Sequence, residues 1–104
     1  MNYHLIFTTE SQDDLKEGFL WYEEKRIGLG FDFMLTIEAT LRLIERNPLT
    51  CPLIQSKVHN IRRAISPKFG FLIFYTVIQQ SAIIVAIVSS KRDPAIWKSR
   101  IGEI

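Results

Sequence analysis

The stretch FLIFYTVIQQSAIIVAIVSS, residues 71–90, contains the most apolar part of the chain. It consists of two segments rich in aromatic and β-branched residues, which are separated by Gln79, Gln80 and Ser81. Residues of these types favour strands, and a nearly unbroken apolar segment is typical of a strand that is covered on both faces. The stretch therefore predicts a hairpin of two central strands, and the rest of the fold is expected to pack around it.

A short strand and a helix are predicted at the start of the chain. YHLIFT, residues 3–8, is short, apolar and aromatic, which is typical of a strand. Thr8 or Thr9 can cap the helix that follows, and Thr9 with Gln12 fits a capping box, so this helix is expected to run from there to about Arg26. Its apolar residues recur at helical spacing and define the face that should meet the core. This face consists of Leu15, Phe19 and Tyr22, widened by Trp21.

A second helix is predicted after GLG, residues 28–30, because two glycines within three residues favour a tight connection. The helix should end near Arg46, since Pro48 cannot continue it. The next segment, residues 47–57, contains both Pro48 and Pro52 and is expected to be a loop. The core face of the second helix comprises Phe33 or Met34, Ile37, Leu41 and Ile44.

The remaining segments complete an α+β fold of order β-α-α-β-β-β-α. VHNIRRAI, residues 58–65, has mixed faces and is predicted as a strand nearer the edge of the sheet. The last segment, residues 93–104, fits a helix with Asp93 as its cap and Pro94 in its first turn. The economical architecture is one domain, residues 1–104, in which a two-helix hairpin packs on one face of a mostly antiparallel four-stranded sheet. The expected core includes Phe7, Phe19, Ile37, Leu41, Ile44, Phe74, Ile84, Ala86 and Val88.

Length, cysteine content and charge restrict the class of protein. A chain of 104 residues can bury one core without a disulfide, and the lone Cys51 cannot form an intramolecular bridge. No segment fits a signal peptide or a membrane span, so a soluble, cytoplasmic protein without a membrane partner is expected. The net charge of +2 conceals a division: residues 1–56 carry five Lys/Arg and nine Asp/Glu, whereas residues 57–104 carry eight Lys/Arg and two Asp/Glu. Such a basic half suggests a polyanion or an acidic protein surface as partner.

The cations of the basic half are expected to gather on the face or rim of the sheet opposite the helices. Near an aromatic ring such as Trp97 or Tyr75, they can hold a nucleic-acid backbone or an acidic peptide. The alternative is that they are solvated charges, which keep an uncovered sheet face soluble. The predicted binding residues are Arg62, Arg63, Lys68, Lys91, Arg92, Trp97, Lys98 and Arg100.

No metal site, cofactor or catalytic group is predicted. His4 and His59 lie far apart and lack the spacing of zinc ligands. Glu23 and Glu24 are expected to be solvated charges rather than an acid–base pair, and Cys51 is expected to be inert. The sequence has no phosphate-binding loop, nucleophile motif or dinucleotide-binding motif, since GLG lacks a third glycine and a preceding strand.

Three segments resemble the RelE/ParE superfamily of type II toxins, often called plasmid stabilisation proteins. WYEEKRIGLGFDF, residues 21–33, resembles the tryptophan-tyrosine helix and Gly-Leu-Gly turn of that superfamily. IRRAISPKFGFLIFYTV, residues 61–77, is similar to its Arg-Arg strand and aromatic strand, and IVAIVSSKRDPAIW, residues 84–97, to its last strand and Arg-Asp-Pro segment. The resemblance implies the same β-α-α-β-β-β-α fold and a cognate antitoxin that wraps and neutralises the toxin. The predicted binding residues would then contact this antitoxin or the target of the toxin.

The superfamily divides by target. RelE-like members are ribosome-dependent endoribonucleases that cut messenger RNA, whereas ParE-like members act against DNA gyrase. Arg63 and Arg92 match basic residues of the ribonuclease pattern, but Ile65 and Leu72 stand where that pattern has a lysine and an arginine. Its terminal catalytic Tyr or His has no clear equivalent either. The resemblance thus favours a ParE-like toxin that acts on gyrase without catalytic residues. The alternatives are a RelE-like ribonuclease acting on the ribosome and messenger RNA and, in another class, a non-catalytic binding module or an inactive toxin relative.

Overall fold

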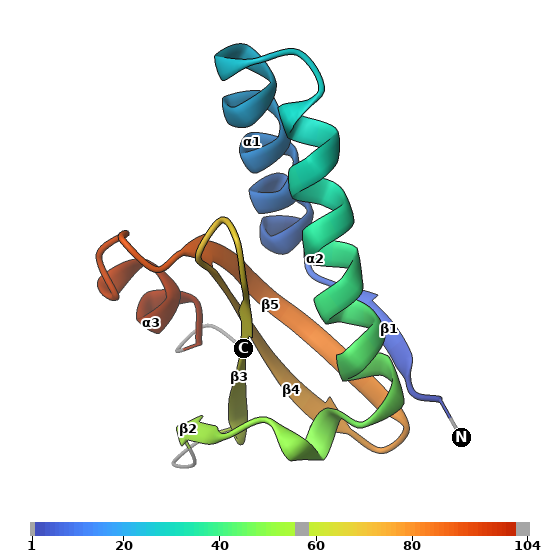
Figure 1. The fold of residues 1–104 in the computed structure, drawn as a ribbon. Helices are drawn as coiled ribbons and strands as arrows, with labels where there is room; N and C mark the ends of the chain where they lie inside the picture. Colours follow the sequence, from blue (N-terminus) through green and yellow to red (C-terminus); the bar gives the residue numbers. More distant parts are fainter. Residues whose placement is uncertain (1, 56–58, 102–104) are drawn as a thin grey trace.

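The fold combines a helical hairpin, a five-stranded sheet and a short C-terminal helix (Figure 1). The computed structural model describes residues 2–55 and 59–101. In chain order the elements are β1 (His4–Phe7), α1 (Thr9–Lys25), α2 (Leu29–Arg46), the 3₁₀ turn η1 (Pro48–Thr50), β2 (Leu53–Gln55), β3 (Ile61–Ser66), β4 (Phe71–Ile78), β5 (Ser81–Ser89) and α3 (Ala95–Ile101).

The strands lie in the order β1-β5-β4-β3-β2, so the predicted hairpin of β4 and β5 occupies the middle of the sheet. Every neighbouring pair is antiparallel except β1 and β5, which are parallel. The prediction of four strands was wrong, because β2 lies in the segment that its two prolines marked as a loop. Leu53 pairs with Arg62 of β3 at the sheet edge, directly after Pro52. Proline is tolerated beside a short edge strand, since its missing N–H is not needed by a neighbour there.

The helix α1 begins one residue earlier than the capping-box pattern indicated. Thr8 is its N-cap, and its Oγ1 accepts a hydrogen bond from the Ser11 N–H at 3.1 Å. The Gln12 side chain donates to the Phe7 carbonyl at 3.2 Å instead of closing a box with Thr9. Thr8 is thus the one of the two candidate threonines that caps the helix, as its extended backbone allows.

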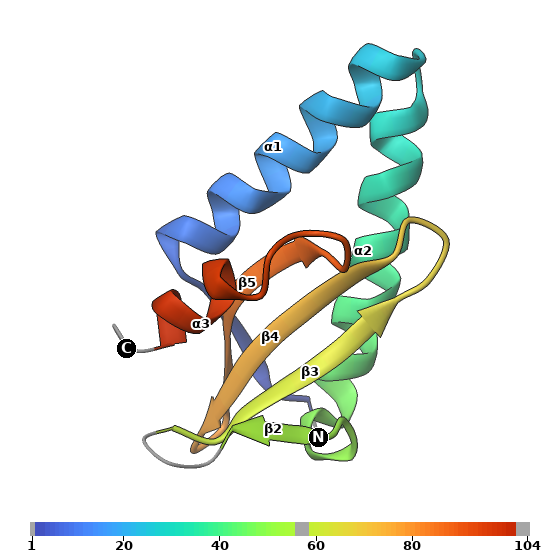
Figure 2. The ribbon, with the colours of Figure 1, turned by 90° about the vertical axis from the view of Figure 1, so that its left-hand side faces the viewer.

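The sheet has a hydrophobic core on each face. The α1–α2 hairpin covers one face, and α3 packs on the other, which Figure 2 shows with α3 in front of the sheet and α2 behind it. Seven of the nine predicted core residues are buried, whereas Phe7 is partly buried and Phe19 lies outside the core, edge-on against the exposed Phe31. The seven are Ile37, Leu41, Ile44 and Ile84 on the hairpin side, and Phe74, Ala86 and Val88 on the α3 side.

The most buried line of α1 consists of small and polar residues, which hydrophobic periodicity does not detect. Ser11, Asp14 and Gly18 are its buried residues, while the predicted Leu15 and Tyr22 are only partly buried. At Gly18 the two helices come so close that a Cβ would lie 2.6 Å from Cζ of Phe33 in α2. A side chain at this position would have to displace the buried ring of Phe33, which fills the space beside the glycine.

Glu23 fixes the connection between the two helices. Its carboxylate accepts hydrogen bonds from the backbone N–H groups of Gly28 and Gly30, both at 2.9 Å. These N–H groups belong to the start of α2, where no earlier carbonyl is available to them and the helix dipole favours negative charge. Glu23 is therefore a cap of α2, and the expectation that it is a solvated charge was wrong.

We expect Glu23→Ala to lower the free energy of unfolding by about 1–2 kcal/mol, the usual cost of losing a helix cap. The measurement is urea denaturation at neutral pH. Glu24→Ala is the matched control, because Glu24 is the next residue, carries the same charge and is exposed. An equal loss of stability in both variants would show that the hydrogen bonds to the Glu23 carboxylate contribute nothing beyond the effect of its negative charge.

Candidate functional site

A buried ion pair ties α3 to α1. The Arg100 guanidinium forms two parallel bonds with the Asp14 carboxylate, with Nη2 and Oδ1 at 2.9 Å. Asp14 also accepts the backbone N–H of Ile87 in β5 at 2.9 Å, and its side chain is only 8% exposed. The hydrogen bonds to Asp14 raise the pKa of Arg100 further above its usual value. Arg100 was predicted as a binding residue, but its charge is engaged within the fold.

Arg62 and Arg63 are adjacent in sequence and point to opposite faces of the sheet, as neighbouring residues of a strand do. Arg62 Nη1 donates to the carbonyls of Leu49 and Cys51, at 3.1 and 2.7 Å, and holds the η1 segment against β3. Arg63 lies opposite Phe74 on the α3 side, and its buried Nε makes no hydrogen bond within the described residues. The two arginines therefore do not form one cationic patch.

The two aromatic residues expected beside the cations belong to the packing of the fold. Tyr75 is fully buried on the hairpin side, where its hydroxyl donates to the Pro48 carbonyl, and burial raises its pKa far above the usual value. The expectation that it stands on the open sheet face was therefore wrong. Trp97 of α3 stacks on Phe74 with ring centroids 4.2 Å apart, and its ring is partly buried in the second core.

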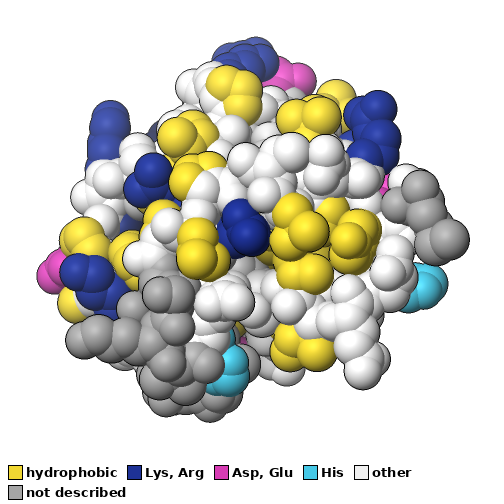
Figure 3. Space-filling model, turned by 90° about the horizontal axis from the view of Figure 1, so that it is seen from below, with side chains coloured by type: hydrophobic (Ala, Val, Ile, Leu, Met, Phe, Trp, Pro, Cys, Tyr) yellow, Lys and Arg dark blue, Asp and Glu magenta, His cyan; other side chains and the backbone are white. Residues whose placement is uncertain are grey.

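The other predicted cations are spread over the surface. Lys68 lies at the β3–β4 connection with its Nζ 5.4 Å from the Phe69 ring centroid, and Lys98 is exposed beside Trp97. In the view from below, Lys and Arg side chains are separated by apolar and uncharged groups (Figure 3). The cations expected together on the face or rim of the sheet opposite the helices are thus divided: Arg62 lies on the hairpin side, α3 covers part of the opposite face, and Lys91 and Arg92 lie beyond the end of β5.

Three of the predicted cations do meet, in a groove of about 730 Å³ between α1 and the end of β5. We call it the α1–β5 groove. Lys91 and Arg92 follow β5 and lie in a turn. Two hydrogen bonds stabilise this turn: Arg92 N donates to the Ser89 carbonyl, and Ala95 N donates to Asp93 Oδ1. The groove is lined by Asp14, Glu17, Gly18, Leu20, Trp21, Tyr22, Glu24, Phe71, Ile87, Val88, Ser89, Lys91, Arg92 and Arg100.

Lys91 and Arg92 are the cations of the groove that are available to a partner. Both are exposed, and neither forms an ion pair with any described residue. The opposite wall carries Glu17 and Glu24 of α1. A basic wall thus faces an acidic wall across an open groove. This arrangement favours a partner that carries acidic groups opposite Lys91 and Arg92 and basic groups opposite the glutamates.

Trp21 is the large exposed aromatic residue of the groove, and the sequence did not predict it there. Its side chain is 57% exposed, with Lys25 Nζ 4.1 Å from the ring centroid, although it was assigned to the core. Trp21 is seven residues after Asp14 and so lies on the same side of α1. The α1–α2 hairpin projects past the end of the sheet (Figure 1), and Trp21 lies close to the C-terminal end of α1, which is Lys25.

Neither a protein-family model nor a curated protein matches the sequence. The structure, in contrast, is similar to a solved chain described as "Chromosomal ParDE TA system from P. aeruginosa". The TM-score is 0.72 and the identity 15%, over 84% of this chain and 95% of that chain. The chain has a ParDE-like fold. The fold that the resemblance to the RelE/ParE superfamily implied, a helical hairpin on a mostly antiparallel sheet, is thereby confirmed, with the fifth strand β2 as the correction to the predicted sheet.

The described residues include no group of three His, Cys, Asp or Glu side chains that could hold a metal ion. Cys51 is a free, partly buried thiol. None of the helices in the described ranges has the length and apolar character needed to cross a membrane.

Proposed function

We propose that this chain is the toxin of a type II toxin–antitoxin system, that a cognate antitoxin neutralises it, and that it acts against DNA gyrase in the manner of ParE-like toxins. The observation that carries the proposal is the shared fold, which extends over 95% of a chain from a ParDE toxin–antitoxin system. The α1–β5 groove supports it, because Lys91 and Arg92 present unpaired charge to a macromolecular partner.

The surroundings of Leu72 and Ile65 favour gyrase over messenger RNA as the target. Leu72 packs against the second core, on the α3 side of the sheet, and Ile65 is 63% exposed with no charge to offer a phosphate. Tyr75 is the nearest phenol to Arg62 along the sheet, and its buried hydroxyl is bound to Pro48. These residues give RNA cleavage neither a second cation nor an accessible acid or base.

The direct test is inhibition of DNA supercoiling by purified gyrase. We expect the chain to inhibit supercoiling or to accumulate cleaved complexes, and the product of the adjacent reading frame to bind the chain and relieve the inhibition. Growth arrest on expression, relieved by the same product, is the corresponding result in cells. If that product neither binds the chain nor relieves arrest, the toxin proposal fails.

Charge reversal in the groove should separate binding from folding. We expect Lys91→Glu with Arg92→Glu to weaken binding to gyrase or to the antitoxin, since like charges set against an acidic partner cost several kcal/mol. Stability should change by no more than about 0.5 kcal/mol per residue, because both side chains are exposed. Titration calorimetry and thermal denaturation measure the two effects. Lys16→Glu is the control, because Lys16 is an exposed cation of α1 outside the groove, and equal weakening by this variant would show only a general charge effect.

A further inference from the structure

The outer face of α2 is apolar although it faces solvent. Phe31, Leu35 and Leu43 are 62%, 65% and 61% exposed, and Ala39 between them is exposed as well. A surface helix normally turns its polar side outward, and α2 already places a full apolar stripe in the core. A second apolar stripe on the same helix marks an interaction surface. This stripe lies outside the α1–β5 groove, to which none of its residues belongs.

The spacing of the stripe determines how another helix can pack on it. Its residues follow one another every four positions, which forms a single ridge along the helix surface. Beside this ridge lies an open hollow of about 460 Å³, whose lining includes Thr36 and Thr40 of α2 and Pro67 and Lys68 of the β3–β4 connection. Two helices that each present such a ridge pack ridge into groove and cross at roughly −50°. Ala39, the smallest member of the ridge, lets the two backbones approach most closely at the crossing point.

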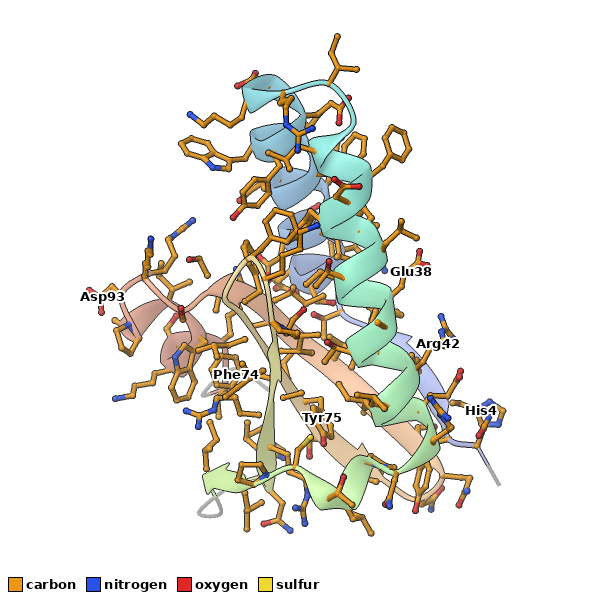
Figure 4. The ribbon with its side chains drawn as sticks, in the orientation of Figure 1. His4, Glu38, Arg42, Phe74, Tyr75 and Asp93 are labelled. Carbon is orange, nitrogen blue, oxygen red and sulfur yellow. The ribbon has the colours of Figure 1, made fainter. Side chains whose placement is uncertain are left out.

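The charged residues beside the stripe can form ion pairs with the same residues of a second copy of the chain. Glu38 and Arg42 are exposed one turn apart, next to Ala39, and both side chains point away from the sheet (Figure 4). A two-fold axis that passes near Ala39 at roughly right angles to α2 makes the two copies of the helix antiparallel at the contact, and this arrangement brings Glu38 of each copy within reach of Arg42 of the other. A partner with one net charge would leave one of these two residues opposed by a like charge.

We propose that the outer face of α2 binds a second copy of this chain through a two-fold interface centred on Ala39. Phe31, Leu35 and Leu43 form its apolar contacts, and the two Glu38–Arg42 pairs flank them. Arg42 loses little stabilisation when it changes partner, because its present ion pair with Glu45 is exposed to solvent. The interface does not depend on the proposed function, because it involves no groove residue.

Sedimentation equilibrium of the purified chain over a range of concentrations tests the proposal. We expect a monomer–dimer equilibrium, and Leu35→Glu or Ala39→Glu should raise the dissociation constant on the order of 100-fold, because symmetry places two uncompensated charges in the interface. Glu10→Arg is the control: Glu10 is an exposed carboxylate of α1, so this change should leave the dissociation constant unaltered.

A charge exchange identifies the partner as a second copy. Glu38→Arg and Arg42→Glu should each weaken self-association, whereas an equimolar mixture of the two variants should form a heterodimer, seen by native mass spectrometry at an intermediate mass. A chain that stays monomeric at every concentration would overturn the proposal, as would a dimer indifferent to Leu35, Ala39, Glu38 and Arg42. It would also be overturned if these variants weakened only antitoxin binding, which would assign the face to the antitoxin. Inhibition of gyrase is measured separately, so failure here leaves the proposed function standing.

Discussion

Replacing Asp14 by alanine is expected to lower the free energy of unfolding by about 3–5 kcal/mol, the usual cost of breaking a buried ion pair from one side. The carboxylate is 8% exposed and joins three elements, since it receives two bonds from Arg100 of α3 and one from the backbone of Ile87 in β5. Its loss leaves a largely buried guanidinium and a buried N–H without their acceptor. Urea denaturation followed by circular dichroism measures the change.

Two further variants show whether the pair itself is responsible. Asp13→Ala removes the neighbouring, exposed carboxylate in the same turn of α1, and should cost no more than about 1 kcal/mol. The double variant Asp14→Ala with Arg100→Ala should be less unstable than the sum of the single variants, because no unpaired charge remains. A loss below about 1 kcal/mol in Asp14→Ala would mean that water replaces the carboxylate, and that the apolar packing of Trp97 and Ile101 is sufficient to hold α3 on the sheet.

The parts of the fold that could be predicted are those in which a local pattern and burial agree. The two strands of the β4–β5 hairpin are almost wholly apolar and lie in the middle of the sheet, covered by helices on both faces. The second helix has a core stripe of regular spacing and ends at Arg46 as predicted, although it begins at Leu29, within the GLG segment. The strand β2 could not be predicted, because its three residues gain their structure from pairing with Arg62 rather than from their own composition.

The candidate site depended on contacts that sequence patterns do not contain. Asp14 and Ile87 are 73 residues apart in the chain and share a hydrogen bond, so the groove beside them arises from tertiary packing. Counting charges also gave no means of separating Arg100 and Arg62, which bond within the fold, from Lys91 and Arg92, which remain unpaired. Trp21 was assigned to the core because helical spacing places it correctly on the inner side of α1 but does not reveal where the sheet ends.

Expression of this chain without an antitoxin should leave translating messages uncut. Metal-free cleavage of RNA requires a base for the 2′-hydroxyl, an acid for the leaving oxygen and positive charge at the phosphate. Arg63 and Arg92 are the two cations that match the ribonuclease pattern. The Nε of Arg63 is buried on the α3 side of the sheet and is therefore not accessible to a phosphate. Each missing donor at the phosphate removes about 3–4 kcal/mol of transition-state stabilisation, by analogy with one oxyanion donor. Tyr75, which pairs with Arg62 across the sheet, is buried and bonded to Pro48, and the loss of such an acid or base removes a further factor of about 10²–10⁴.

The measurement is genome-wide mapping of message ends after induction, with a RelE-like ribonuclease expressed in the same host as the positive control. We expect new ends at ribosomal A-site codons in the control only, while plasmid DNA from cells expressing this chain loses negative supercoiling. The leucine at position 72, where the ribonuclease pattern has an arginine, is part of the packing of the fold. Its side chain packs with the second core, so an arginine there would have to leave that core to reach a phosphate. Message ends at A-site codons that disappear in Arg63→Ala or Arg92→Ala would instead establish ribonuclease action, and with it a catalytic use of the sheet face that α3 partly covers.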